Sequence, residues 1–195
     1  VIGVGLFGRL SRPRKATFSQ RKACNFCSMV VLLGRPILFF LFRCPHLAFL
    51  ALLARPAYKI TFGDPERVIL CGFSRGAIAA NAIGLHDDEI AKLWRGFVCY
   101  SHYDGVSSRW PFAGADAASA RKRLGRLKGR PQLICSEFPH AGTRKHLENA
   151  GHAGDFTFLE TGYRNHNDAW ILRPSAARDT ARNWLAEVIR KPAGK

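Results

Sequence analysis

Residues 1–63 contain no aspartate or glutamate, although ten lysine or arginine residues lie among them. Residues 64–195 hold all fourteen acidic residues and twenty basic ones, a net charge of +6 against +16 for the whole chain. Most of the basic excess therefore lies in one third of the sequence, and the remainder has the charge balance of an ordinary globular protein. The net charge alone does not indicate a nucleic-acid partner, and none is expected.

A long uninterrupted hydrophobic run is also missing. Residues 29–54 are strongly apolar, but the longest stretch among them without a charged residue is eleven residues, from Cys44 to Ala54. A spanning helix needs about twenty mostly apolar residues. A signal peptide needs a short basic leader and a cleavage site of small residues, and neither is clear here. We therefore expect no membrane association, and the sequence assigns neither a compartment nor an oligomeric state.

The six cysteines do not form a metal-binding pattern. Cys24 and Cys27 have the spacing of a redox pair or half a zinc site, but no second Cys or His pair accompanies them at ligand spacing. Cys71, Cys99 and Cys135 fall in apolar runs typical of strands, where a free thiol behaves as a small hydrophobic side chain. The sequence predicts no metal, no cofactor and no disulfide framework.

The composition of the first 63 residues is unlike that of a soluble domain, since Arg, Cys, Phe and Leu are in excess and acids are absent. We predict that residues 1–57 are a basic and apolar segment that is not the native front of the domain behind it. A shifted reading frame or a wrong start would produce such a join. A chain of 195 residues is long enough for one well-filled core, and we predict that residues 58–195 form that single domain.

The most informative stretch is residues 68–80, where strand-favouring residues run into the pentad GFSRG at 72–76 and an alanine-rich helical pattern follows. Gly-x-Ser-x-Gly between a strand and a helix is typical of a nucleophile elbow, a strained turn that exposes one serine hydroxyl above a sheet. Side chains at Gly72 or Gly76 would collide with the neighbouring strand and helix. The bare pentad arises by chance in roughly one chain in twenty of this length, so its flanking strand and helix carry the prediction.

Strands and helices alternate from the elbow onward. Strands are expected at residues 68–71, 96–101, 132–135 and 155–163, and helices at 75–83, from 87, at 117–127, at 143–150 and from 174. This order predicts an α/β fold with a mostly parallel sheet and helices on both faces. We expect that sheet to be incomplete at the N-terminal side.

The helices carry recognisable caps and faces. Asp87 is the expected N-cap of the second helix and Thr143 or Gly142 of the fourth, and Pro174 and Ser175 are expected to start the last helix. The last helix has an apolar stripe at helical spacing, made of Ala177, Ala181, Trp184, Leu185 and Val188. The helix at 117–127 has a basic face that we expect to be solvated, made of Arg121, Lys122, Arg123 and Arg126. No interleaved aromatic residues suggest nucleic-acid binding there.

Three groups are needed for serine chemistry. A serine hydroxyl becomes a good nucleophile when a histidine takes its proton and a carboxylate holds that histidine in the right tautomer. In an elbow-containing fold the order along the chain is Ser, acid, His, each following a strand. Ser74 follows the first predicted strand, and His166 follows the last strand before the closing helix. His166 is also the only histidine after residue 152.

The acid and the oxyanion donors are less well defined. Glu137, directly after the third predicted strand, is the preferred acid, and Asp104, after the second, is the alternative. The backbone N–H of Arg75, the residue after the nucleophile, is the expected oxyanion donor. A second donor normally comes from a loop after an earlier strand, and we find no such loop in residues 1–63.

Over about residues 58–190 the chain resembles the α/β-hydrolase superfamily, and residues 1–57 do not match it. More narrowly it is similar to a little-characterised bacterial branch, at VILCGFSRGA (68–77), LHDDEI (85–90), SHYDG (101–105) and NHNDAW (165–170). The elbow alone is also similar to a phospholipase-like branch. The resemblance implies the fold and a serine hydrolase mechanism without naming a substrate.

The expected function is hydrolysis of a small-molecule carboxylic ester or other acyl substrate through an acyl-enzyme. Two alternatives remain. The first is a peptidase of the same fold, because the triad chemistry does not choose between ester and amide. The second is a catalytically defective hydrolase-like protein whose basic N-terminal segment binds anionic surfaces.

Overall fold

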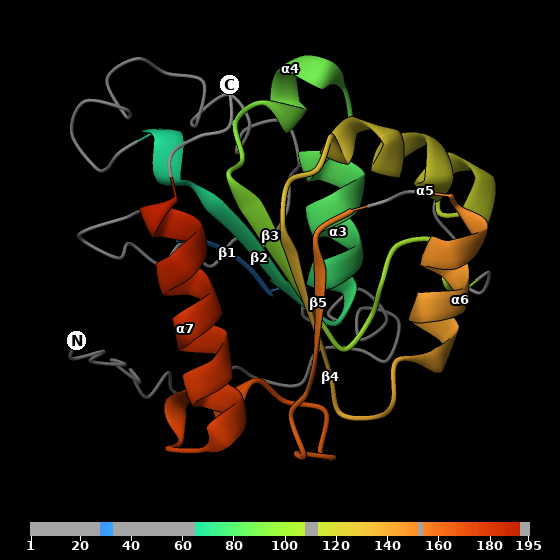
Figure 1. Ribbon diagram of the computed structural model, residues 1–195. Coiled ribbons are helices and arrows are strands. Elements are labelled where there is room, and N and C mark those ends of the chain that lie inside the picture. The colour runs from blue at the N-terminus through green and yellow to red at the C-terminus, as the bar shows by residue number, and fades with distance from the viewer. Residues whose placement is uncertain (1–27, 33–64, 108–112, 152–153, 192–195) are drawn as a thin grey trace, which may run out of the picture.

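The computed structural model describes residues 28–32, 65–107, 113–151 and 154–191, and Figure 1 shows their arrangement. The elements along the chain are β1 (Ser28–Leu32), η2 (Pro65–Arg67), β2 (Ile69–Phe73), α3 (Arg75–Gly84), α4 (Asp88–Ala91), β3 (Gly96–Tyr100), α5 (Ala117–Leu124), η3 (Gly125–Leu127), β4 (Gln132–Ser136), α6 (Ala141–Asn149), β5 (Phe156–Glu160), η4 (Ala169–Leu172) and α7 (Ala176–Arg190).

The described strands form one sheet in the order β1-β2-β3-β4-β5. Strands β2 to β5 are parallel, and β1 pairs with β2 in the antiparallel direction. The prediction of an α/β fold with a mostly parallel sheet is therefore confirmed. Strand β1, which lies within residues 1–57, was not predicted. The remainder of that segment, including Cys24 and Cys27, lies outside the described residues.

Helices cover both faces of the sheet, as predicted. The chain crosses from β2 to β5 in one direction, and right-handed crossovers then place the connecting helices on one face. Helices α3, α5 and α6 lie on that face, and α7 lies on the other (Figure 1). The carboxyl ends of the four parallel strands consequently meet at one edge of the sheet, where the connecting loops can bring distant residues together.

Two apolar clusters fill the space between sheet and helices, and alternation along each strand divides the residues between them. In β2, Leu70 packs toward α3 and Ile69 toward α7; in β4, Ile134 and Leu133 divide in the same way. The thiols of Cys71, Cys99 and Cys135 are free, and their burial raises the pKa of each. They are neutral packing groups, as predicted.

The closing helix follows its predicted pattern. Ser175 caps α7, its Oγ accepting a hydrogen bond from the Arg178 backbone N–H at 3.2 Å. Ala181, Trp184 and Val188 are buried against the sheet, and the other two residues of the stripe pack partly against the same cluster. One buried face thus holds this helix against the sheet.

Two cap predictions had different outcomes. Asp87 caps α4 as expected, since its Oδ1 accepts from the Ile90 N–H at 2.8 Å, although this helix is a single turn. The prediction of Thr143 or Gly142 as the cap of α6 was wrong, because that helix begins at Ala141 with His140 at the N-cap. The His140 ring is buried, and its centroid lies 5.1 Å from that of the Phe158 ring. The Arg144 N–H donates to the His140 carbonyl, so the helical hydrogen bonds begin at His140.

The prediction that the whole basic face of α5 and η3 is solvated was wrong for two of its four residues. Arg121 and Lys122 are exposed. Arg123 instead binds the buried Asp104, and Arg126 donates to the Leu85 carbonyl at the end of α3 at 3.1 Å. The two latter guanidinium groups have protein acceptors because α5 and η3 lie against α3 and the loop after β3.

No helix within the described ranges has both the length and the apolar character needed to cross a membrane.

Candidate active site

Ser74 lies at the junction of β2 and α3 in a backbone conformation that serine rarely adopts, with φ 56° and ψ −122°. The turn is tight enough that a Cβ on Gly72 would overlap the Gly76 carbonyl and lie 2.6 Å from the Ala77 nitrogen. A side chain at position 72 is therefore excluded, as the elbow pattern requires. The predicted strained turn between strand and helix is present.

The Ser74 side chain does not cap the helix that it precedes. An N-cap serine ordinarily accepts a hydrogen bond from an N–H of the first turn, but Ser74 makes no such side-chain bond. Its Oγ instead lies 3.1 Å from Nε2 of His166, 92 residues further along the chain. The hydroxyl is thereby left to interact with a base.

His166 lies in the loop after β5, also with a positive φ of 38°. Its ring packs against Phe73 at 5.0 Å between centroids. The loop is tied to the sheet by the Tyr100 hydroxyl, which donates to the Asn167 carbonyl at 3.0 Å. Desolvation raises the pKa of Tyr100 to about 12, so its phenol keeps this proton. These contacts set the imidazole in front of Ser74.

Glu137 follows β4, and its Oε1 lies 3.2 Å from Nδ1 of His166. The Glu137 side chain is 4 % exposed, whereas that of His166 is 54 % exposed. A carboxylate opposite Nδ1 favours the tautomer with a proton on Nδ1 and a free lone pair on Nε2. The structure thus brings Ser74, His166 and Glu137 together in one hydrogen-bonded row, in the geometry of a Ser-His-Glu triad.

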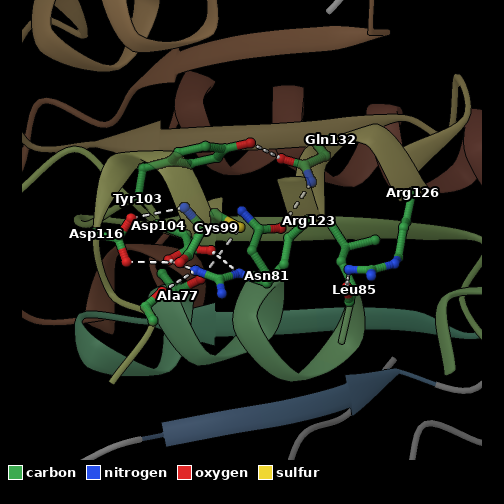
Figure 2. A network of polar contacts seen from close by, with 12 residues as sticks. Ala77, Asn81, Leu85, Cys99, Tyr103, Asp104, Asp116, Arg123, Arg126 and Gln132 are labelled. Atoms are coloured by element: carbon green, nitrogen blue, oxygen red, sulfur yellow. Dashed lines mark hydrogen bonds and ion pairs between the residues drawn. The ribbon is translucent and has the colours of Figure 1, made fainter. Parts of the chain in front are cut away.

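Asp104, the alternative acid, is engaged elsewhere. Its carboxylate binds Nε and an Nη of Arg123 at 2.8 and 3.0 Å, and Arg123 also donates to the Gly114 carbonyl. Figure 2 shows the pair of Asp104 and Arg123. Asp104 is buried, and desolvation raises its pKa while Arg123 opposes that shift. No hydrogen bond joins it to His166 in the described part of the chain. Its interactions tie the loop after β3 to α5.

The same loop is anchored to α3 by a buried amide network (Figure 2). The Tyr103 hydroxyl donates to Oε1 of Gln132 at 2.6 Å, and Nε2 of Gln132 donates to Oδ1 of Asn81 at 2.9 Å. All three residues are almost completely buried. The network joins the helix that begins after Ser74 to the loop that begins at Ser101, and so fixes two sides of the site relative to each other.

Ser101, which follows β3, was not predicted as a site residue. Its Oγ lies 3.1 Å from Nδ1 of His166, the nitrogen that also faces Glu137. The neighbouring His102 ring lies 5.5 Å from that of His166, and desolvation lowers the pKa of His102. The available signal was position, because Ser101 directly follows a parallel strand just as Ser74 does.

Backbone strain is concentrated in this site. Four described residues other than glycine have a positive φ, and three of them are Ser74, Ser101 and His166; the fourth is Lys128, at the end of η3. Each such conformation costs on the order of 1–3 kcal/mol. Strain of this kind persists where surrounding structure enforces it, and functional sites are where it clusters.

The oxyanion prediction concerns the first residue of α3, Arg75. The backbone N–H groups in the first turn of a helix have no partner within the helix and point outward from its N-terminal end, where the helix dipole favours negative charge. The position of Arg75 after Ser74 is therefore suited to a developing oxyanion. The second donor was sought in residues 1–63, nearly all of which lie outside the described residues.

Within the described ranges, no group of three or more His, Cys, Asp or Glu residues is arranged to hold a metal ion. Comparison of the chain with models of protein families, with curated proteins and with solved structures found no match.

Proposed function

We propose that the protein is a serine hydrolase of the α/β-hydrolase type that cleaves carboxylic esters through an acyl-enzyme. The observation that carries the proposal is the row of contacts from Ser74 Oγ to His166 Nε2 and from His166 Nδ1 to Glu137 Oε1, at 3.1 and 3.2 Å. The strained backbone of Ser74 and its unused helix cap support the same reading.

In the proposed reaction, His166 Nε2 takes the Ser74 proton as Oγ attacks the ester carbonyl carbon. The carbonyl oxygen becomes an oxyanion, toward which the Arg75 N–H donates. The tetrahedral intermediate collapses when the imidazolium returns its proton to the departing alkoxide, which leaves an acyl group on Ser74. Water, activated by His166 in the same way, then releases the acid. Glu137 holds the tautomer and stabilises the imidazolium throughout.

A fluorophosphonate probe, which phosphonylates activated serines, tests this proposal. Wild-type protein is expected to be labelled at Ser74, as located by peptide mass spectrometry, and Ser74→Ala is expected to remain unlabelled. Hydrolysis of p-nitrophenyl acetate should disappear in the same variant, and a matching p-nitroanilide separates amide from ester cleavage. Folded wild-type protein that neither reacts with the probe nor cleaves any of these substrates would contradict it.

A further inference from the structure

Two side chains face the same nitrogen of the candidate base. Nδ1 of His166 lies 3.1 Å from Ser101 Oγ and 3.2 Å from Glu137 Oε1. The two residues come from different elements, since Ser101 follows β3 and Glu137 follows β4. A single N–H on Nδ1 can be shared between two acceptors at such distances.

The direction of the Ser101 hydrogen bond matters for the chemistry. A hydroxyl can either donate or accept. If Ser101 donated to Nδ1, the imidazole proton would lie on Nε2, and His166 could not take the proton of Ser74. If Nδ1 carries the proton, Ser101 accepts it beside the carboxylate, and Nε2 keeps its lone pair toward Ser74.

The backbone of Ser101 shows that the hydroxyl is held in place against a conformational preference. Its φ is 77°, a region that favours glycine, and its N–H donates to the Cys135 carbonyl at 2.9 Å. Glycine would relieve the strain at this position but would remove the side chain that reaches His166.

We infer that Ser101 is a positioning residue for His166, a second acceptor that shares the Nδ1 proton with Glu137 and thereby holds the productive tautomer. The inference rests on the proposed function for its catalytic consequence. Ser101 touches the base and not the reacting atoms, so its removal should lower kcat and leave KM unchanged.

The test compares Ser101→Gly with Lys128→Gly in the full chain. Both replace a positive-φ residue by glycine, so neither is expected to lower the thermal unfolding midpoint. Lys128 lies outside the site, where its ammonium makes an exposed ion pair with Asp88. We expect kcat for ester hydrolysis to fall about tenfold in Ser101→Gly, the equivalent of one hydrogen bond of ordinary net strength, and to stay unchanged in Lys128→Gly.

A tautomer measurement distinguishes positioning from a general structural role. In protein with ¹⁵N-labelled histidine, the two ring nitrogen shifts of His166 are expected to report a proton on Nδ1 in the wild type. The Nε2–H tautomer should rise in Ser101→Gly alone. Unchanged ring shifts in Ser101→Gly, or a kcat equal to that of Lys128→Gly, would overturn the inference. If wild-type protein hydrolyses no ester, the proposed function fails, and the ring shifts still decide whether Ser101 sets the tautomer.

Discussion

The hydroxyl of Ser74 has two competing uses, and the backbone decides between them. As the residue before α3 it could cap the helix, an interaction whose loss typically costs about 0.5–2 kcal/mol. At φ 56° its Oγ instead lies against His166, and the strained conformation adds its own cost. The conformation of Ser74 thus lowers the stability of the fold, and it leaves the Ser74 hydroxyl available to a base.

The two candidate acids give opposite predictions at the residue scale. Glu137→Gln should lower kcat on the order of 10³-fold, because the imidazole loses its carboxylate, while stability changes little. Asp104→Asn should leave kcat per active site close to wild type but destabilise the fold by about 3–5 kcal/mol, since it removes the negative charge that faces Arg123 in a nearly buried pair.

Urea unfolding, together with kcat normalised by fluorophosphonate titration of active sites, measures both effects. The reverse pattern, with activity lost in Asp104→Asn and kept in Glu137→Gln, would make Asp104 the acid.

The site residues that could be predicted from the sequence are those whose role follows from chain order. Ser74, Glu137 and His166 each follow a parallel strand, and parallel strands end at one edge. Ser101 also follows a parallel strand, but the order Ser, acid, His gives no role to a second serine, and nothing in the local sequence shows a serine held at positive φ. The pairing of Asp104 with Arg123 was also missed, since helical spacing gives the face of Arg123 but not what lies against it.

At the scale of elements, the loops after β3, β4 and β5 share a second property. In the described part of the chain, the exposed large apolar residues all belong to these loops: Val106, Phe138, Ile171 and Leu172. Phe138 directly follows Glu137 and is 53 % exposed. Under the proposed function, apolar side chains at the edge that holds Ser74, His166 and Glu137 are suited to contact an apolar part of a substrate.

From these loops we predict that the protein prefers esters with longer acyl chains. Phe138→Ser should lower kcat/KM for p-nitrophenyl octanoate about tenfold, because part of the apolar contact of one phenyl ring is lost. The same variant should hydrolyse p-nitrophenyl acetate at the wild-type rate, since two carbons reach little beyond the nucleophile. Equal losses on both esters would show that Phe138 supports the site without contacting the acyl chain.

Elements were predicted where a local period or cap defined them. Strands β2 to β5 and helices α3 to α7 carry their own apolar alternation, helical pattern or N-cap, and so their existence follows from short windows of sequence. The antiparallel pairing of β1 with β2 depends on a partner about forty residues away, which local patterns do not contain. The start of α6 depends on the packing of His140 on Phe158, which is likewise tertiary.

At the scale of the whole molecule, buried histidines link stability to pH. His140 and His146 are 6 % and 8 % exposed, and desolvation is the main cause that lowers the pKa of each. Nε2 of His146 is buried and makes no hydrogen bond to any described residue. These two histidines therefore bind protons less readily in the folded state than in the unfolded chain.

We accordingly expect the free energy of unfolding to fall on acidification. Above the unfolded-state histidine pKa of about 6.5 neither state is protonated, and the full stability is present. Below pH 6.5 the unfolded state binds more protons than the folded state, so the free energy of unfolding falls as the pH falls. This decline ends once the pH is below the lowered folded-state pKa values. Urea unfolding at pH 7.5, 6.5 and 5.5, followed by tryptophan fluorescence, measures the decline.

His146→Leu is the matched variant, because it replaces a buried titrating ring by an apolar side chain. It should keep the wild-type stability at pH 7.5 or exceed it, since the unbonded Nε2 is removed. Its loss of stability between pH 7.5 and 5.5 should be smaller than that of the wild type, because one group that prefers protonation in the unfolded chain is gone. Parallel stability curves for the two proteins would mean that acid acts through other groups.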